Sequence, residues 1–368
     1  MNVPYLDLKT AYKDIDDALL LAYKRVLQSG RVMLGTEVTA FETAYAKFSG
    51  VNYCVGVGNG LDAIILSLLT LGIGAGDEVI VPSNTYIATL VAVSRVGATP
   101  ILVEPKIDTY NIDPKNIVPA ITKKTKAIIP VHLFGQACQM DEILRIAKKY
   151  HIFVIEDNAQ SHGATFDNKK TGSFGHINAT SFYPGKNLGA IGDAGAVTTN
   201  SEVYAKKIQS LRNYGESKRY VNDRIGFNSR LDELQAAFLR VRLAHLKTYT
   251  KQKQHIAHLY DTQLKGIGDI TLPTTEKGAT NVYHVYPIRT KKRDGLQKYL
   301  ESKSIKTLIH YPIPPHLQRA YTTLKFKKGS LPIAESLAKT SLSLPIFPTM
   351  TDAQVTYVIH MIKQFFKK

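Results

Sequence analysis

From about residue 50, short apolar runs alternate with stretches in which apolar residues recur at helical spacing. The apolar runs predict strands at 53–57, 78–81, 101–103, 127–131, 152–156, 179–182 and 194–198. The stretches between and after them predict helices at 61–71, 86–96, 114–121, 140–150, about 202–213 and 231–246. Such alternation with near-continuous apolar strands predicts an α/β fold, in which helices cover both faces of an open, mostly parallel sheet of seven strands.

The composition changes near the end of the last of these helices. Beyond Tyr249 the chain becomes richer in Lys, Pro and Tyr. We therefore predict a large domain over residues 31–248 and a smaller C-terminal α/β domain over residues 249–368. Residues 1–30 are predicted to be a segment that packs on the small domain or on a partner subunit.

The charge is strongly positive, because 47 Lys and Arg residues face 30 Asp and Glu residues and give a net charge of +17. The basic residues occur in short runs rather than in a long basic helix or an aromatic-interleaved stripe. This distribution does not favour a nucleic-acid-binding surface. An anionic small substrate, such as a nucleotide diphosphate, fits the same charge and needs no extended patch.

The two cysteines, Cys54 and Cys138, form neither a CxxC motif nor a paired framework, so neither a thiolate metal site nor a disulfide scaffold is expected. This cysteine usage is typical of a reducing cytoplasm. The first residues carry no apolar signal core, and no apolar run reaches the ~18 residues that a membrane span needs. We expect a cytoplasmic protein without metal or membrane partner.

In an open parallel sheet, ligands bind beyond the carboxyl ends of the strands, so the loops there are the first place to look for chemistry. The first such loop is Gly58-Asn59-Gly60. Its glycines let the backbone approach an anion closely, and the next helix offers free N–H groups at its start. The loop is either a phosphate site or a plain tight turn between strand and helix. It matches neither the GxGxxG nor the Walker pattern.

The second loop follows the most apolar strand and contains Asp157 and Gln160. A carboxylate at the end of a buried strand is costly unless it has a partner, and a cationic ring nitrogen is one such partner. An Asp facing the pyridine nitrogen of pyridoxal 5′-phosphate keeps that ring protonated. Gln160 would then reach the 3-oxygen of the ring. The alternative is that Asp157 caps the following turn.

The third segment runs from Ser181 to Ala190 and places Lys186 among apolar and glycine residues just past a strand. A partly desolvated lysine has a lowered pKa and becomes a nucleophile that can bind an aldehyde. Ser181 would donate its hydroxyl to a phosphate. The alternative is an exposed turn lysine. Together the three loops supply a phosphate site, a ring-nitrogen carboxylate and a reactive amine.

These segments resemble a known family. The matching runs lie at 156–164, 181–189 and 192–196, with further matches at 3–8, 226–237 and 310–318. They are similar to the DegT/DnrJ/EryC1/StrS sugar aminotransferases, which are fold-type I pyridoxal-phosphate enzymes. The resemblance covers nearly the whole chain.

The resemblance implies roles for individual residues. Lys186 would be the catalytic residue that binds pyridoxal phosphate, with pyridoxamine phosphate as the intermediate form. The implied cofactor residues are Gly58, Asn59, Gly60, Tyr86, Asp157, Gln160, Ser181 and Asn228. Among them, Tyr86 would stack on the ring and Asn228 would reach the phosphate of the other subunit, which makes a homodimer with shared active sites. The implied substrate residues are Tyr183, Arg230, His310 and Tyr311, and ordinary packing at a domain junction is the alternative for each.

The implied reaction moves the amino group of L-glutamate, which leaves as 2-oxoglutarate, onto a nucleotide-linked keto sugar. Lys186 stands where the sugar dehydratases of this family carry His, which favours transamination over dehydration. The loop Gly58-Asn59-Gly60 resembles that of enzymes acting on dTDP-linked 3-keto-6-deoxyhexoses, with deoxysugar and surface-glycan or lipopolysaccharide biosynthesis as the setting. A 4-keto-sugar aminotransferase, a dehydratase and a regulatory or nucleic-acid-binding relative are the alternatives.

Overall fold

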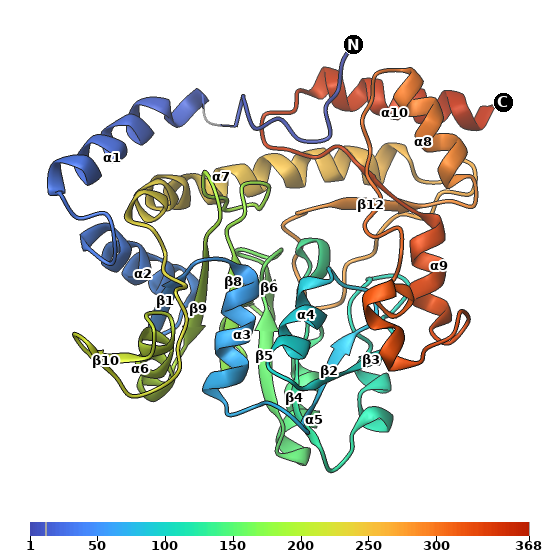
Figure 1. Cartoon of the computed structure of the whole chain (residues 1–368). Helices are drawn as coiled ribbons and strands as arrows, with labels where there is room; N and C mark the ends of the chain where they lie inside the picture. Colours follow the sequence, from blue (N-terminus) through green and yellow to red (C-terminus); the bar gives the residue numbers. More distant parts are fainter. Residues whose placement is uncertain (12, 368) are drawn as a thin grey trace.

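The computed structural model describes residues 1–11 and 13–367 and centres on a seven-stranded sheet in the order β1-β9-β8-β5-β4-β2-β3 (Figure 1). Its strands are β1 (Tyr53–Val57), β2 (Glu78–Pro82), β3 (Thr99–Val103), β4 (Thr125–Ile128), β5 (Phe153–Asp157), β8 (Ile177–Ser181) and β9 (Gly195–Thr199). Only β9 runs antiparallel to its neighbours, β1 and β8, and the other pairs are parallel. The predicted α/β fold with a mostly parallel sheet of seven strands is confirmed.

Helices cover both faces of this sheet because its strands are apolar on both sides. Along β2, Val79 and Val81 belong to the core on one face, whereas Ile80 belongs to the core on the other. The first core is covered by helices that lie between strands in the chain, and the second by the helix before β5. These helices are α3 (Gly60–Thr70), α4 (Ala88–Arg95), α6 (Glu202–Leu211) and α5 (Met140–Tyr150).

A second group of elements follows the sheet in the chain. It comprises α7 (Glu233–Gln263), β12 (Tyr286–Arg289), α8 (Arg293–Ser302), α9 (Pro332–Thr340), β13 (Ser341–Leu344) and α10 (Asp352–Lys367). The strands β12 and β13 pair antiparallel, and their buried residues form a core with the second half of α7 and with α8 and α10. Val3 joins this core and pairs with Ile305, so the start of the chain lies on this part of the molecule.

The long helix α7 spans both parts of the molecule. Its first half packs on α1 (Asp16–Ser29) and α2 (Thr36–Ser49), whereas Ile256 and Tyr260 in its second half belong to the core around β12. The helix predicted at 231–246 is therefore too short, since the Lys- and Gln-rich sequence beyond it continues the helix. The boundary predicted at residue 248 falls inside α7, and the division into domains stays a prediction.

The helix predicted at 114–121 is wrong. Two short 3₁₀ turns stand there, η2 (Pro114–Asn116) and η3 (Val118–Ala120). The first turn does begin at residue 114, where the Asp113 side chain accepts a hydrogen bond from the Lys115 N–H and Pro114 is the first helical residue. Pro119 lacks an N–H group and prevents a longer helix.

The remaining short elements connect these parts. They are η1 (Lys13–Ile15), η4 (Leu133–Gly135), η5 (Pro315–Leu317), η6 (Arg319–Leu324) and the strand pairs β6 (Thr165–Phe166) with β7 (Lys169–Lys170) and β10 (Glu216–Lys218) with β11 (Val221–Asn222). Over residues 1–11 and 13–367, no helix combines the length and the apolar character needed to cross a membrane. In the same part of the chain, no group of His, Cys, Asp and Glu residues is arranged to hold a metal ion.

Candidate active site

The predicted loops meet at one edge of the sheet. The strands β1, β5 and β8 are mutually parallel, because β9 runs antiparallel to both β1 and β8, and their carboxyl ends therefore point the same way. Asp157 is the last residue of β5, Ser181 is the last residue of β8, and Gly58 follows β1. Lys186 lies five residues beyond β8.

Asp157 is buried and hydrogen-bonded at the end of β5. Its Oδ2 accepts a hydrogen bond of 2.9 Å from the Thr89 hydroxyl, and its Oδ1 accepts one of 3.1 Å from the Ala159 N–H. The second bond is the turn cap that the sequence left open as an alternative. The carboxylate also acts on the amine of Lys186, whose pKa it raises. Asp157 is thus both a cap and the electrostatic partner of Lys186.

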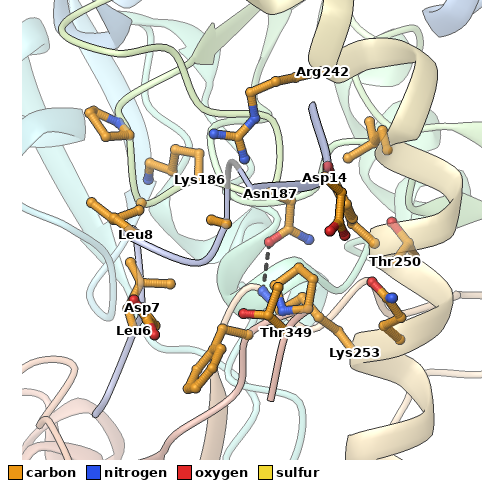
Figure 2. A pocket seen from close by; sticks show the side chains of 18 residues that line it. Leu6, Asp7, Leu8, Asp14, Lys186, Asn187, Arg242, Thr250, Lys253 and Thr349 are labelled. Carbon is orange, nitrogen blue, oxygen red and sulfur yellow. Dashed lines mark hydrogen bonds between the residues drawn. The ribbon is translucent and has the colours of Figure 1, made fainter. Parts of the chain in front are cut away.

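Lys186 sits in a tightly closed loop (Figure 2). Its own N–H donates to the Tyr183 carbonyl at 2.8 Å, and the Ala190 N–H donates to the Phe182 carbonyl at 2.7 Å. A side chain at Gly189 would collide with the Pro184 carbonyl. Burial lowers the pKa of the Lys186 amine to about 8, and the Asp157 carboxylate offsets part of that effect. The amine is therefore not an exposed turn lysine, and about a tenth of it is uncharged at pH 7.

The Gly58-Asn59-Gly60 loop forms the start of α3. The Asn59 Oδ1 accepts a hydrogen bond of 2.9 Å from the Asp62 N–H and so caps the helix. A Cβ atom at Gly60 would lie 2.5 Å from the Ser181 Cβ, so the helix start rests directly on the end of β8. The first turn of an α-helix has N–H groups without intrahelical partners. The N–H groups at the start of α3 and the Ser181 hydroxyl together make a site suited to a phosphate.

Ser229 connects this loop to the segment before α7. The Gly58 N–H donates to the Ser229 hydroxyl at 3.1 Å, and that hydroxyl donates to the Asp62 Oδ2 at 2.6 Å. Ser229 is buried, whereas its neighbour Asn228 is exposed. Within one chain, Asn228 thus lies beside the phosphate site with its side chain free to meet another surface.

Gln160 is buried between two segments. Its Oε1 accepts a hydrogen bond of 2.8 Å from the Phe134 N–H, and its Nε2 donates to the Tyr311 hydroxyl at 3.1 Å. The Tyr311 ring lies 5.7 Å from the ring of Tyr86, measured between centroids. Tyr86 stands just before α4, at the edge of the sheet, and is 54% exposed. Gln160 and Tyr86 therefore both contact Tyr311, and the charge of Asp157 also acts on Tyr311.

His310 lies next to this group, with its ring against those of Phe134 and Tyr311. The His310 Nδ1 is 2.8 Å from the Ser343 hydroxyl, and burial, followed by the charge of Lys186, lowers the pKa of His310 to about 4. Tyr183 is 58% exposed. Arg230 is half-buried and donates to the Asn213 Oδ1 at 3.2 Å, outside any contact with Lys186. Tyr183 is thus largely exposed, whereas Arg230 lies against Asn213 and Tyr214.

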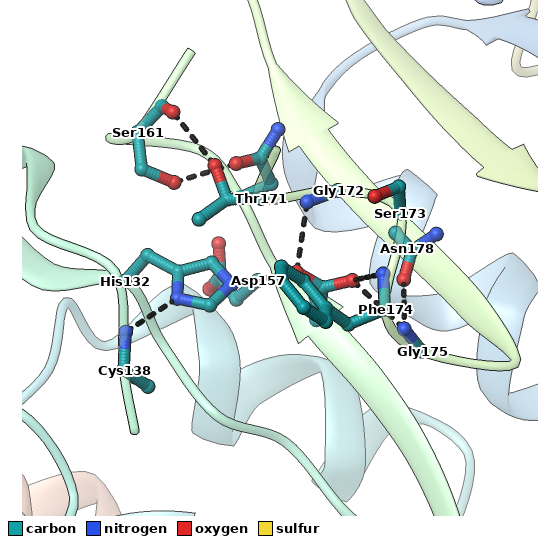
Figure 3. A network of polar contacts seen from close by, with 12 residues as sticks. His132, Cys138, Asp157, Ser161, Thr171, Gly172, Ser173, Phe174, Gly175 and Asn178 are labelled. Atoms are coloured by element: carbon teal, nitrogen blue, oxygen red, sulfur yellow. Dashed lines mark hydrogen bonds and ion pairs between the residues drawn. The ribbon is translucent and has the colours of Figure 1, made fainter. Parts of the chain in front are cut away.

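A buried network of hydrogen bonds surrounds Glu156, the residue before Asp157 on β5 (Figure 3). Glu156 accepts hydrogen bonds from the N–H groups of Gly172, Phe174 and Gly175 at 2.5–2.8 Å. Its Oε2 also lies 2.7 Å from the His132 Nε2. Because the Cys138 N–H donates to the His132 Nδ1 at 3.0 Å, the Nε2 carries the proton and donates to Glu156. The network fixes the end of β5.

These side chains fit pyridoxal phosphate. A buried amine of lowered pKa can bind the aldehyde, the Asp157 carboxylate suits a protonated ring nitrogen, and the start of α3 with Ser181 suits the phosphate. The close approach of Gly60 to Ser181 leaves no room for a side chain that would cover the helix start. The donor set therefore matches the charges of the cofactor at three separate points.

Comparison with known proteins agrees with this geometry. The model of the DegT/DnrJ/EryC1/StrS aminotransferase family matches residues 13–363. The chain belongs to this family. It is 48% identical over 363 residues to the dTDP-3-amino-3,6-dideoxy-alpha-D-galactopyranose transaminase of Aneurinibacillus thermoaerophilus, with 99% of each chain covered. It is 45% identical to the dTDP-3-amino-3,4,6-trideoxy-alpha-D-glucose transaminase of Streptomyces venezuelae, covering 99% of this chain and 96% of that protein.

Solved structures of the family have the same fold. DesV of S. venezuelae, solved in complex with a ketimine intermediate, superposes with a TM-score of 0.98 at 44% identity, covering 100% of this chain and 99% of DesV. NtdA of Bacillus subtilis, solved with the bound cofactor PMP, gives a TM-score of 0.94 at 33% identity, covering 100% of this chain and 86% of NtdA. The expected resemblance to the sugar aminotransferases is thus confirmed.

Sequence reasoning missed several residues of the site. Thr89 donates to Asp157, Phe134 holds Gln160 through its N–H, and Asn187 anchors the loop of Lys186 to a distant segment. Each makes its contact across at least 26 residues of sequence. A signal was available only for Asn187, which directly follows Lys186 in the run at 181–189.

Proposed function

We propose that this chain is a pyridoxal-phosphate-dependent aminotransferase that converts a dTDP-linked 3-keto-6-deoxyhexose to the 3-amino sugar with L-glutamate as amino donor. The observation that carries the proposal is the half-buried Lys186 at the carboxyl edge of the sheet, where burial lowers the pKa of its amine to about 8 and the charge of the Asp157 carboxylate acts on it. The names of full-length relatives at 45–48% identity support the class of substrate.

Each of these side chains would bind a different part of the cofactor. Lys186 would hold the cofactor covalently, Asp157 would face the ring nitrogen and Gln160 the 3-oxygen, and Tyr86 would stack on the ring. The start of α3 at Gly58, Asn59 and Gly60 would bind the phosphate together with Ser181. When bound, the cofactor supplies an electron sink for the electron pair left by a departing proton. Asp157, fixed by Thr89 and Ala159, would keep the ring nitrogen charged.

Lys186 would also move the proton. When the amine is not bound to the cofactor, it would be a base of pKa about 8. It would take the proton from the Cα of glutamate, and in the second half-reaction it would deliver a proton to the sugar carbon that receives the amino group. His310, whose pKa is lowered to about 4, is neutral at pH 7 and can donate or accept hydrogen bonds near the sugar together with Tyr311 and Tyr183.

We place the working enzyme in the cytoplasm as a homodimer with shared active sites. Three neighbouring side chains support this: Ile225 is 96% exposed, Tyr220 is 82% exposed, and Asn228 is exposed next to the phosphate site. Apolar side chains that are exposed close together in one segment, as Tyr220, Val221 and Ile225 are, are typical of a surface that another protein covers. Asn228 would then contact the phosphate held by the partner subunit, and Arg230 and Tyr183 would line the sugar site from this surface. The product would serve deoxysugar and surface-glycan biosynthesis.

The experiment that tests the proposal is product analysis. The purified enzyme is incubated with L-glutamate and dTDP-linked 3-keto or 4-keto 6-deoxyhexoses. The masses of the products are measured by mass spectrometry, and the carbon that carries the new amino group is assigned by NMR. We expect a 3-amino sugar and 2-oxoglutarate with the 3-keto substrate, and no product with Lys186→Ala. A 4-amino sugar as the main product, or loss of water without amination, would contradict the proposed reaction.

A further inference from the structure

A second amine, that of the buried Lys253, lines the same cavity as Lys186. Lys253, on α7, is 5% exposed, and its Nζ donates a hydrogen bond of 2.9 Å to the Asn187 Oδ1 (Figure 2). A longer contact of 3.4 Å joins the same Nζ to the His284 carbonyl. Both acceptors are neutral oxygens. Removing a charged amine from water costs free energy, and hydrogen bonds to neutral oxygens offset only part of that cost. The position of Lys253 therefore requires a physical explanation.

Asn187, the acceptor, follows Lys186 directly in the chain. Its Nδ2 donates to the Val282 carbonyl at 2.9 Å, so both ends of the amide are bonded and its orientation is set by Lys253 on one side and Val282 on the other. The next residue of α7, Gln254, donates to the Asn281 carbonyl at 3.1 Å. The loop of Lys186 is therefore anchored to α7 and to residues 281–284 at once.

The same segment reaches the loop that holds Gln160. The Val282 N–H donates to the Gly135 carbonyl at 2.9 Å, and the Phe134 N–H donates to the Gln160 Oε1 at 2.8 Å. Gly135 is required here, because a Cβ atom on it would lie 2.7 Å from the His284 nitrogen. Displacement of residues 281–284 would thus disturb both the Lys186 loop and the Gln160 loop.

Charged groups surround Lys253 on several elements. Asp7, Asp14, Lys186 and Arg242 line the same cavity as Lys253. Burial lowers the pKa of Lys253 to about 7. The charges of both Lys186 and Lys253 also contribute to lowering the pKa of His284, after burial itself, so the two amines act on one imidazole. Lys253 and Lys186 thus line one cavity, and the contact that links Lys253 to the Lys186 loop is its hydrogen bond to Asn187.

We propose that Lys253 is a positioning residue for the catalytic lysine: its bond to Asn187 holds the Lys186 loop against residues 281–284 and thereby aims the Lys186 amine at the cofactor. The inference rests on the proposed function. It assigns to α7, an element remote in sequence from the motifs of the site, a direct part in setting the geometry of the reacting amine.

The test compares Lys253→Met with Lys251→Met. The first removes the buried amine and keeps most of the side-chain volume, whereas the second removes an exposed amine from the same helix. Both are purified as full-length holoenzyme and checked for folding by circular dichroism. For Lys253→Met we expect kcat to fall by about 10- to 100-fold, the range for a misplaced reacting group, with the KM for the keto sugar changed less than about threefold. Lys251→Met keeps the wild-type values.

A spectral titration separates positioning from plain loss of stability. The visible band of the cofactor bound to Lys186 is followed against pH. In Lys253→Met its midpoint moves up, because a loop that is less tightly held admits more water, which favours the protonated form. A structural role alone would lower the melting temperature and leave the midpoint and kcat of the folded protein unchanged, and that result would overturn the proposal.

Asn187→Ala tests the same bond from its other end. If Lys253 acts through Asn187, the double variant Lys253→Met with Asn187→Ala has nearly the same kcat as Asn187→Ala alone. If the losses in activation free energy of the two single variants add up in the double variant, the proposal is contradicted. Should Lys253→Met not fold, the kcat and the titration midpoint of Asn187→Ala decide, and wild-type values would overturn the inference. A wild-type enzyme without transaminase activity would instead refute the proposed function, so the two failures are distinguishable.

Discussion

A Cβ atom on Gly60 would lie 2.5 Å from the Ser181 Cβ, so the first residue of α3 rests against the last residue of β8. This contact places the helix start and the Ser181 hydroxyl at one point. We expect Gly60→Ala to weaken cofactor binding at least ~10-fold and to cost about 1–3 kcal/mol of folding free energy, as overpacking does. Equilibrium dialysis against the cofactor and thermal unfolding measure both quantities.

Gly74→Ala is the matched control. A Cβ atom there would meet its nearest neighbour, the Val96 carbonyl, at 3.4 Å, which is ordinary van der Waals contact. Its cofactor affinity should equal that of the wild type. Equal affinities for Gly60→Ala and Gly74→Ala would show that the Gly60–Ser181 contact does not shape the phosphate site.

Asp157→Asn removes the charge proposed to face the ring nitrogen and keeps the shape of the side chain. We expect kcat to fall by on the order of 10²-fold or more, because the site then lacks its pre-organised partner for the ring charge. Thr89→Val removes only the hydroxyl that donates to the Asp157 Oδ2 and should cost about 10-fold or less. Steady-state kinetics of both variants check this order, and a Thr89→Val defect as large as that of Asp157→Asn would argue against the charge as the main factor.

The lowered pKa of Lys186 predicts how the apoenzyme takes up its cofactor. Only the uncharged amine attacks the aldehyde, so the rate should rise with pH and level off above a midpoint near 8, the pKa to which burial lowers Lys186. An ordinary lysine would give a midpoint near ~10.4. Stopped-flow absorbance at a series of pH values measures the rate, and a rise that continues past pH 10 would contradict a buried amine.

The network of Glu156 predicts a stability effect. Glu156 is fully buried and accepts hydrogen bonds from three backbone N–H groups and from His132. Glu156→Gln turns one acceptor oxygen into a donor that faces these donors. We expect a loss of about 3 kcal/mol or more in the free energy of unfolding, measured by chemical denaturation. A loss within ~0.5 kcal/mol would show that water replaces the lost bonds.

Much of the fold could be predicted from local patterns in the chain. The strand at 53–57 and the helix at 140–150 have the predicted bounds, because period-2 and period-3.6 patterns are local properties. The rule for parallel sheets then placed Asp157 and Ser181 at one edge. The antiparallel direction of β9 and the full length of α7 depend on tertiary packing and left no comparable local pattern.

The site shows the same division between local and distant features. The Gly58-Asn59-Gly60 loop, Asp157 and Lys186 stand next to strands and could be found by their position in the pattern. The bonds from Lys253 to Asn187 and from Gln160 to Tyr311 join residues 66 and 151 positions apart. A single sequence carries no record of such pairs, because a Lys in a polar helix or a Tyr in a loop has the same local pattern whether it is buried or exposed.

The most direct test of the account is to identify the lysine that binds the cofactor. The holoenzyme is reduced with borohydride, digested, and mapped by mass spectrometry. Two buried amines of lowered pKa compete, Lys186 at about 8 and Lys253 at about 7, so the outcome discriminates between them. We predict the cofactor mass on the peptide that contains Lys186 and on no other. Labelling of Lys253, or no labelled lysine in an enzyme that contains its cofactor, would contradict the assignment of the active site.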